Sequence, residues 1–223
     1  MNVEEQVAKF WGLEEYSDRK ILSQEEKECE LYFSQTSKRD ESGRFIINIP
    51  FKENPSILGN SYNGSLRRLH SLENKLQRNP VLKEQYTAFL EEYEALHHMN
   101  KVDDTSQSTT AYYMPHHAVI RSESPTTKIR VVFDASATTD NGISLNHIRM
   151  VGPTLQDDLF SILVRFRSHA YVVAADIEKM YRQILVAPEQ RSLQRILWRK
   201  TTEDPIEVFE LNTVTYGTAS API

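Results

Sequence analysis

The 223-residue chain is 39% hydrophobic and 26% charged, a composition typical of globular rather than disordered proteins. It has no apolar run long enough to cross a bilayer, its acidic N-terminus is unlike a signal peptide, and its single cysteine excludes an internal disulfide. We therefore expect an intracellular protein without a membrane partner. The net charge is −5, but residues 111–223 carry 12 cations, nine of them arginine, against 12 acidic residues. That half is compatible with binding to nucleic-acid phosphates.

The first predicted helix begins at Ser23, because Ser23 and Glu26 form a capping-box pattern, and it extends to about Phe33. A short strand at Phe45–Phe51 follows a polar turn. The segment 53–64 is rich in Asn, Gly, Ser and Pro, which indicates a loop.

Two further helices are predicted on either side of the Asn79-Pro80 break, and we interpret both as packing elements. Their apolar residues recur at helical spacing: Leu66, Leu69, Leu72 and Leu76 in the first, and Leu82, Tyr86, Phe89, Tyr93 and Leu96 in the second. The polar run from Asp103 to Thr110 closes the second helix.

The second half of the chain favours short strands. Ala118–Ile120 and Ile129–Phe133 are predicted to form a β-hairpin with a polar tip, and Asn141-Gly142 a turn. Thr154 and Asp157 form a second capping box. The helix that it opens is predicted to point these residues inward: Leu155, Leu159, Ile162, Leu163 and Phe166.

The apolar run Tyr171–Ala175 predicts a strand buried on both faces, and it ends at Asp176. Further extended runs are Gln183–Val186, Leu193–Trp198 and Ile206–Leu211. The predicted fold class is α+β, with antiparallel strands and a packed helix. A carboxylate at the end of a buried strand is well placed to bind Mg²⁺, whereas the alternative is that Asp176 caps the turn Ile177–Met180.

Other kinds of site find less support in the sequence. The pairs His97-His98 and His116-His117 have no neighbouring cysteine and no zinc-binding pattern. The chain has neither a glycine-rich phosphate loop nor the Asp-Ser/Thr-Gly signature of a retroviral-type protease. Cys29 lies in a helical pattern, so we interpret it as a packed small residue.

Seven blocks between Pro115 and Pro222 occur in a distinctive order and spacing: PHHAVI, KIRVVFDAS, SLN, VGPTLQDDLFSILVRFR, ADIEKMYRQI, RILWR and ELNTVTYGTASAP. In these blocks the chain resembles a reverse transcriptase, most closely that of Bel/Pao long-terminal-repeat retrotransposons. Residues 1–114 resemble, less distinctively, the connector between protease and polymerase in such polyproteins.

The resemblance implies a partial right-hand polymerase fold, with fingers and an incomplete palm preceded by a helical linker region. The boundaries that it suggests are 1–65 for the linker, 66–110 for a helical segment leading into the fingers, 111–170 for the fingers with their hairpin and helix, and 171–223 for the start of the palm.

The resemblance also implies a metal site. Asp176 matches the first catalytic metal ligand, and the backbone carbonyl of Ile177 would also face metal. The complete enzyme is expected to use two Mg²⁺ or Mn²⁺ ions. Tyr181 matches the aromatic residue under the sugar of the incoming nucleotide, where its ring would exclude a ribose 2′-hydroxyl. The alternative is that Tyr181 is an ordinary half-buried aromatic residue.

In the fingers, Arg130 matches the arginine that binds the triphosphate, and Arg121 is the best match to a second cation that is usually lysine. The alternative for both is a solvated hairpin edge. Asp134 and Asn146 match positions for which structural and template-side roles are expected.

Near the end, Tyr216 and Gly217 match the block that touches nucleotide and template, although many relatives carry glutamine in place of Tyr216. Gly217 would let the backbone approach the ligand. A Tyr-x-Asp-Asp hairpin, the second catalytic element, is absent. Asp103-Asp104 and Asp157-Asp158 lack the strand–turn–strand setting that would let them replace it.

The implied function is that of a fragment of an RNA-directed DNA polymerase, expected to be inactive alone. In the complete enzyme its partners would be an RNA or DNA template–primer, deoxynucleoside triphosphates and other modules of a Gag-Pol-type polyprotein. The expected location is the cytoplasm, in a retrotransposon particle, or the nucleus. The alternative is a non-catalytic remnant that binds nucleic acid weakly or serves as an interaction module. Because its sheet would be incomplete, we expect exposed apolar faces and marginal stability or association.

Overall fold

The computed structural model describes residues 22–102, 110–120 and 129–219. The helices are α2 (Gln24–Thr36), α3 (Tyr62–Gln77), α4 (Pro80–Ala95), α5 (Leu145–Ile148) and α6 (Leu159–Arg167), with short 3-10 helices η1 (Pro55–Ile57), η2 (Met180–Gln183) and η3 (Pro188–Gln194). The strands are β1 (Lys38–Arg39), β2 (Phe45–Ile47), β3 (Met99–Val102), β4 (His116–Ile120), β5 (Ile129–Phe133), β6 (Leu185–Val186), β7 (Arg195–Trp198) and β8 (Glu207–Leu211). The predicted α+β class is confirmed.

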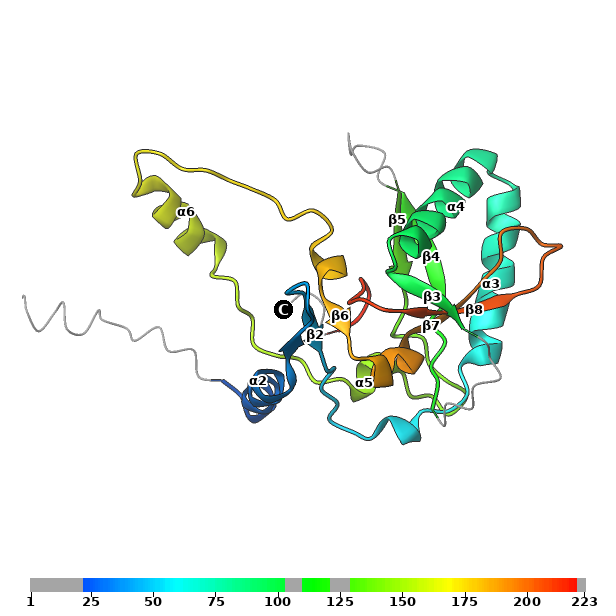
Figure 1. The fold of residues 1–223 in the computed structure, drawn as a ribbon, viewed down its shortest axis with the longest axis horizontal. Coiled ribbons are helices and arrows are strands. Elements are labelled where there is room, and N and C mark those ends of the chain that lie inside the picture. Colours follow the sequence, from blue (N-terminus) through cyan, green and yellow to red (C-terminus); the bar gives the residue numbers. More distant parts are fainter. Residues whose placement is uncertain (1–21, 103–109, 121–128, 220–223) are drawn as a thin grey trace, which may run out of the picture.

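The strands of the described residues form three small sheets (Figure 1). The antiparallel sheet β3–β8–β7 includes β3, a strand that the sequence did not predict. The predicted hairpin is confirmed as β4 paired with β5. In the third sheet, β1 pairs antiparallel with β2, but β2 pairs parallel with β6, which departs from the expected antiparallel arrangement. That parallel pair aligns Ile46 with Leu185, so it joins the two halves of the chain.

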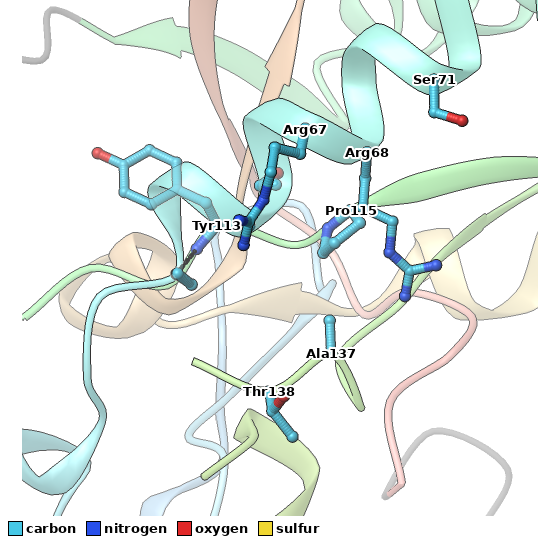
Figure 2. A pocket seen from close by; sticks show the side chains of 10 residues that line it. Arg67, Arg68, Ser71, Tyr113, Pro115, Ala137 and Thr138 are labelled. Carbon is cyan, nitrogen blue, oxygen red and sulfur yellow. Dashed lines mark hydrogen bonds between the residues drawn. The ribbon is translucent and has the colours of Figure 1, made fainter. Parts of the chain in front are cut away.

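Capping side chains begin the helices of the first half much as predicted. The Ser23 hydroxyl accepts a hydrogen bond of 3.2 Å from the Glu26 amide, and the Glu26 carboxylate accepts one of 2.7 Å from the Ser23 amide. Asn79 caps α4 by accepting from the Leu82 amide at 3.1 Å. Helix α3 begins at Tyr62, inside the predicted loop, and its first turn borders a cavity (Figure 2).

Helices α3 and α4 lie side by side and pack with their predicted apolar faces against sheet β3–β8–β7 and the β4–β5 hairpin (Figure 1). Their buried apolar residues are Leu69, Leu72 and Leu76 of α3 and Leu82, Tyr86, Leu90 and Tyr93 of α4. The expected inward position of Leu96 is wrong, because this residue ends the helix and is exposed. Cys29 is buried in α2, as expected for a packed residue.

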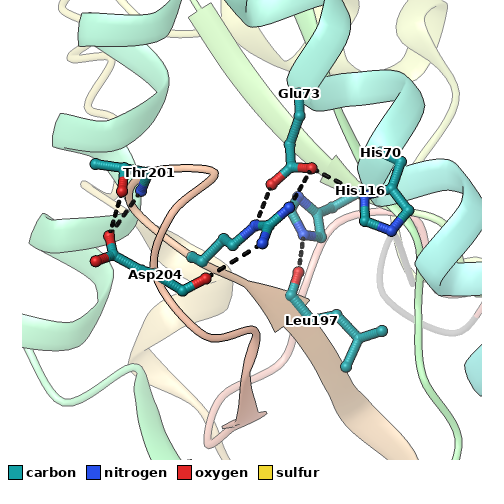
Figure 3. A network of polar contacts seen from close by, with 7 residues as sticks. His70, Glu73, His116, Leu197, Thr201 and Asp204 are labelled. Atoms are coloured by element: carbon teal, nitrogen blue, oxygen red, sulfur yellow. Dashed lines mark hydrogen bonds and ion pairs between the residues drawn. The ribbon is translucent and has the colours of Figure 1, made fainter.

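The imidazole of His116 is buried in this core, and Figure 3 shows its contact with the carbonyl of Leu197. Its Nε2 is 2.9 Å from the carbonyl oxygen of Leu197, and only a protonated Nε2 can donate there. Its Nδ1 is hydrogen-bonded to the Tyr86 hydroxyl, so the neutral ring satisfies both nitrogens. Near this site, Arg199 pairs with Glu73 through two hydrogen bonds, of 2.6 and 3.0 Å, and so joins the end of β7 to α3.

The helix predicted after Thr154 is confirmed only as the shorter α6, and the other predictions for the segment 154–175 are wrong. Helix α6 begins at Leu159, with Asp158 rather than Thr154 as its cap, and the residues predicted to point inward do not reach a core. The segment predicted as a buried strand has no strand structure, and the side chains of Tyr171 and Val173 are 94% and 91% exposed. Figure 1 shows α6 and the chain after it extending away from the sheets.

The physical reason is the lack of a partner for these segments. A strand needs a neighbour to pair its backbone amides and carbonyls, and an apolar helix face needs a second apolar surface. Among the described residues, neither is provided for α6 or for the segment 171–175. Apolar periodicity alone therefore did not decide the structure here.

Acid is predicted to destabilise the fold through its buried histidines. Burial lowers the pKa of His116, and likewise that of His98, to about 4. In the unfolded chain each histidine takes up a proton below about pH 6.5, while the folded chain does so only near pH 4. Stability should therefore fall as the pH drops from 6.5 to 4, by about 1.4 kcal/mol per pH unit for each histidine.

Urea unfolding measured between pH 7 and pH 4.5 checks this prediction. Replacing the exposed His117 by Asn provides the control, which should retain the pH dependence of the unaltered chain. His116→Gln should show a shallower slope than the control. Equal slopes for the two variants would mean that His116 does not contribute.

Candidate nucleotide-binding site

Arg130 stands on the outer face of the β-hairpin. Alternate residues of a strand face opposite sides, and in β5 the side chains of Val131 and Phe133 are buried while Arg130 is only half-buried. Arg130 lies opposite Val119 of β4. Its guanidinium carbon is 4.8 Å from the centre of the Tyr216 ring, a distance at which a cation is attracted to the face of the ring.

Tyr216 also contacts Tyr181. The two ring centres are 4.7 Å apart, with 80° between the ring planes, which is the favoured edge-to-face arrangement. Arg130, Tyr181 and Tyr216 thus form one group, which we call the arginine–tyrosine cluster. Its members come from β5, from η2 and from the turn that follows β8.

Backbone pairing explains why the two tyrosines meet. The amide of Val186 donates to the Asn212 carbonyl at 2.8 Å, and the amide of Val214 donates to the Ile184 carbonyl at 3.0 Å. These bonds hold residues 184–186 antiparallel to residues 212–214. Because the two strands run in opposite directions, the residues just before 184 and just after 214 lie at the same end of the pair.

Gly217 is required by close packing inside the protein. Its φ is +95°, and a Cβ atom there would lie 2.0 Å from the carbonyl oxygen of Phe133. The sequence suggested that the missing side chain lets a ligand approach the backbone. In the structure, it instead lets the turn pack closely against the end of β5. The turn is thereby held against the strand that carries Arg130.

The side chain of Asn146 fixes the same turn. Its amide nitrogen donates to the Gly217 carbonyl at 3.1 Å and to the Ser136 hydroxyl at 2.7 Å, and its amide oxygen accepts from the Ala219 amide at 2.8 Å. Asn146 therefore has a structural role.

Residues that sequence reasoning missed hold η2 against α4. Arg182 lies over the rings of Phe89 and Tyr93, at 4.9 and 4.5 Å from their centres. Its guanidinium also pairs with Glu92 at 3.2 Å, and Lys179 pairs with the same carboxylate at 2.6 Å. The hydrogen bond from Lys179 is the main reason that the pKa of Glu92 is lowered. The signal in the sequence was an acid and two aromatic residues on one face of α4.

Asp176 and Ile177 lie apart from regular structure. Both precede η2 in an exposed segment, so Asp176 does not stand at the end of a buried strand as predicted. Among the described residues, no hydrogen bond from the following turn to the Asp176 carboxylate is found, so the capping alternative has no support either.

The described residues do not fit the expected pair of metal ions. They include no group of three or more His, Cys, Asp or Glu side chains that could hold a metal. Asp176 supplies one carboxylate, and a two-metal centre for phosphoryl transfer needs more ligands. Arg121, the second predicted phosphate contact, lies outside the described residues.

The comparisons with known proteins leave the assignment open. Neither a protein-family model nor a curated protein sequence matches the chain. Within the part of the chain that the structure describes, no helix has the length and apolar character needed to span a membrane.

Replacing Gly217 by Ala is predicted to disrupt the turn. Gly142 provides a matched control, because its φ is +84° and a Cβ there would meet nothing within 4 Å. Both changes carry the strain of a left-handed backbone, about 1–2 kcal/mol. Gly217→Ala should cost about 1–3 kcal/mol more, because the added Cβ collides with the Phe133 carbonyl. Urea unfolding measures the stability of both variants. Equal losses of unfolding free energy would show that the close contact at Gly217 is unimportant.

Proposed function

We propose that this chain contains the fingers and the beginning of the palm of an RNA-directed DNA polymerase of the retrotransposon type, and that the arginine–tyrosine cluster contacts an incoming deoxynucleoside triphosphate. The observation that supports the proposal is the contact among Arg130, Tyr181 and Tyr216. The resemblance gives all three a role at the nucleotide, although they are widely separated in sequence. Their meeting in one cluster is what a shared ligand would require.

The chemistry of the cluster suits a nucleotide. A guanidinium group donates two parallel hydrogen bonds to a phosphate, and it keeps its charge at any physiological pH. The contact with the Tyr216 ring restrains the Arg130 side chain while leaving its N–H groups able to donate. The two tyrosine rings, nearly perpendicular to each other, offer aromatic surface against which a sugar or a base can pack.

Catalysis is a separate matter from binding. Under the proposal, Asp176 and the carbonyl of Ile177 would contribute to the site of one Mg²⁺ or Mn²⁺ ion, and residues beyond those described would have to supply the remaining ligands. The partners would be a template–primer and the other modules of a Gag-Pol-type polyprotein, in a retrotransposon particle.

A second candidate, a non-catalytic interaction module, is favoured by the exposed apolar surface of α6. Large side chains on this helix and after it are open to solvent, among them Leu159, Phe160, Leu163, Tyr171 and Val173. Contiguous exposed apolar residues commonly mark interaction sites. This function does not require the arginine–tyrosine cluster to bind anything.

Arg130→Ala is predicted to weaken binding of dTTP about tenfold or more, because hydrogen bonds to charged groups contribute roughly 1.5–3 kcal/mol. Arg167→Ala is the matched control, since it removes the same charge from an exposed site on α6. Isothermal titration at several salt concentrations measures both. The dependence of affinity on salt should also flatten for Arg130→Ala alone. Similar affinities for the two variants would contradict the proposed role of Arg130.

Tyr181→Ala is predicted to reduce the preference for dTTP over the ribonucleotide UTP, because the ring that would exclude the 2′-hydroxyl is removed. Competition titrations give the ratio of the affinities for dTTP and UTP. Because 5-methyluridine triphosphate has the same base as dTTP, the same titration with it isolates the effect of the 2′-hydroxyl. An unchanged ratio would assign Tyr181 to packing only.

Magnesium-dependent primer extension by the purified chain is expected to be absent, because the described residues lack a two-metal ligand set. A radiolabelled primer–template assay with Mg²⁺ and with Mn²⁺ measures it. Measurable extension would contradict this expectation.

A further inference from the structure

A cavity of about 390 Å³ lies beside the first turns of α3, and none of its lining residues belongs to the arginine–tyrosine cluster. Its walls come from α3, from the segment leading into β4 and from the loop after β5. The lining residues are Ser61, Gly64, Ser65, Arg67, Arg68, Ser71, Tyr113, Pro115, Ala137 and Thr138. Figure 2 shows the two arginines descending from α3 toward Tyr113 and Pro115.

The cavity is lined by groups that donate hydrogen bonds to anions. Arg67 and Arg68 supply two guanidinium groups, and the described lining residues include no acid. Outside the lining, the carboxylate of Asp134 is 3.1 Å from Arg68 and offsets one of the two positive charges. Arg67 has no recorded ion pair within the described part of the chain, so its charge is available to a ligand.

Ser65 points to a ligand independently of the arginines. Its side chain is one of the cavity walls, and the residue is only 2% exposed. Among the described residues, no hydrogen bond partner for its hydroxyl is found, and the hydroxyl oxygen is not one of the fully buried unpaired atoms, so it is open to the cavity. A bound group with acceptor oxygens would satisfy it.

The N-terminus of α3 also favours the binding of an anion. The cap residue Ser61 makes no side-chain bond to the first turn, because its hydroxyl accepts from the Tyr113 amide at 2.8 Å. The Tyr62 amide donates to the side-chain oxygen of Asn60 at 2.8 Å, but no protein acceptor is found among the described residues for the amides of Asn63 and Gly64, and these together with the helix dipole favour an anion. A Cβ at Gly64 would meet nothing within 4 Å, so the backbone here is open to approach.

We propose that this cavity binds a phosphate group, held by Arg67, Arg68, the Ser65 hydroxyl and the first turn of α3. The phosphate belongs either to a nucleic-acid backbone or to a small phosphorylated molecule. The site is distinct from the nucleotide contacts proposed above, and it does not depend on the polymerase assignment.

A neighbouring cavity favours a nucleotide unit as the carrier of this phosphate. It has a volume of about 430 Å³ and shares Ser61 and Tyr113 with the first. It also contains Tyr62, whose ring meets that of Tyr113 edge to face with the centres 5.1 Å apart. Aromatic rings next to a cationic groove are the usual means of holding a single strand of nucleic acid, by stacking on bases and contacting phosphates.

The test uses the full chain and two probes, inorganic phosphate and a fluorescent twelve-nucleotide single-stranded oligothymidylate. Arg67→Gln removes the available guanidinium, and Arg78→Gln removes an exposed arginine from the other end of α3 as a control. Ser65→Ala removes only a hydroxyl group that has no partner in the described protein, so it should leave thermal unfolding unchanged.

Arg67→Gln is expected to weaken binding of at least one probe tenfold or more, Ser65→Ala to weaken the same probe severalfold, and Arg78→Gln to change it less than twofold. If the variants lose binding of the oligonucleotide alone, the ligand is a nucleic-acid backbone. If they lose binding of inorganic phosphate alone, the ligand is a small phosphorylated molecule. Either supports the site. Binding of both probes that is equal in Arg67→Gln and Arg78→Gln would overturn it. Arg130→Ala should leave phosphate binding unchanged, which separates this result from the test of the nucleotide site.

Discussion

The imidazole ring of His116 joins three parts of the fold that lie far apart in sequence. It is bonded to Tyr86 of α4 and to the Leu197 carbonyl of β7, and its ring centre is 6.2 Å from that of Phe133 in β5. The Leu197 carbonyl requires a proton on Nε2, and burial disfavours a second proton, so the ring is neutral and its Nδ1 accepts from the Tyr86 hydroxyl. Helix α4, the β4–β5 hairpin and the sheet β3–β8–β7 are therefore held together by polar contacts of one buried ring. Water cannot take the place of these contacts, because it does not reach the ring.

The candidate site depends on this core through β5. Phe133 packs inward against His116, while Arg130 of the same strand faces outward to Tyr216. The carbonyl of Phe133 also receives the turn at Gly217, where no side chain can be accommodated. The geometry of the arginine–tyrosine cluster is consequently fixed by how the strand is packed, and not by contacts among the three half-buried side chains alone.

Local patterns predicted the first half well. The capping box at Ser23 and the Asn79-Pro80 break gave the starts of α2 and α4, because these signals act through hydrogen bonds within a few residues. The same reasoning failed for Tyr171–Ala175, since a strand is decided by its partner and not by its own apolar residues. The parallel pairing of β2 with β6 likewise had no local signal.

The candidate site likewise combines features that the sequence indicated with features that it did not. The members of the arginine–tyrosine cluster came from a resemblance, which indicates residues but not the contacts that support them. Asn146 was expected to have a structural or template-side role, but its three hydrogen bonds to the Gly217 turn and Ser136 join loops that no sequence pattern relates. Arg182 was missed because its partners lie about 90 residues earlier, on α4.

The most direct test of the central claim, that Arg130, Tyr181 and Tyr216 form one nucleotide-binding surface, is photo-crosslinking with a deoxynucleoside triphosphate that carries an azide on its base, followed by mass spectrometry of the peptides. The account predicts crosslinks in the peptides that contain Tyr181 or Tyr216, and their loss when unmodified dTTP is added in excess. Crosslinks confined to other parts of the chain, or crosslinks that excess dTTP does not remove, would contradict it.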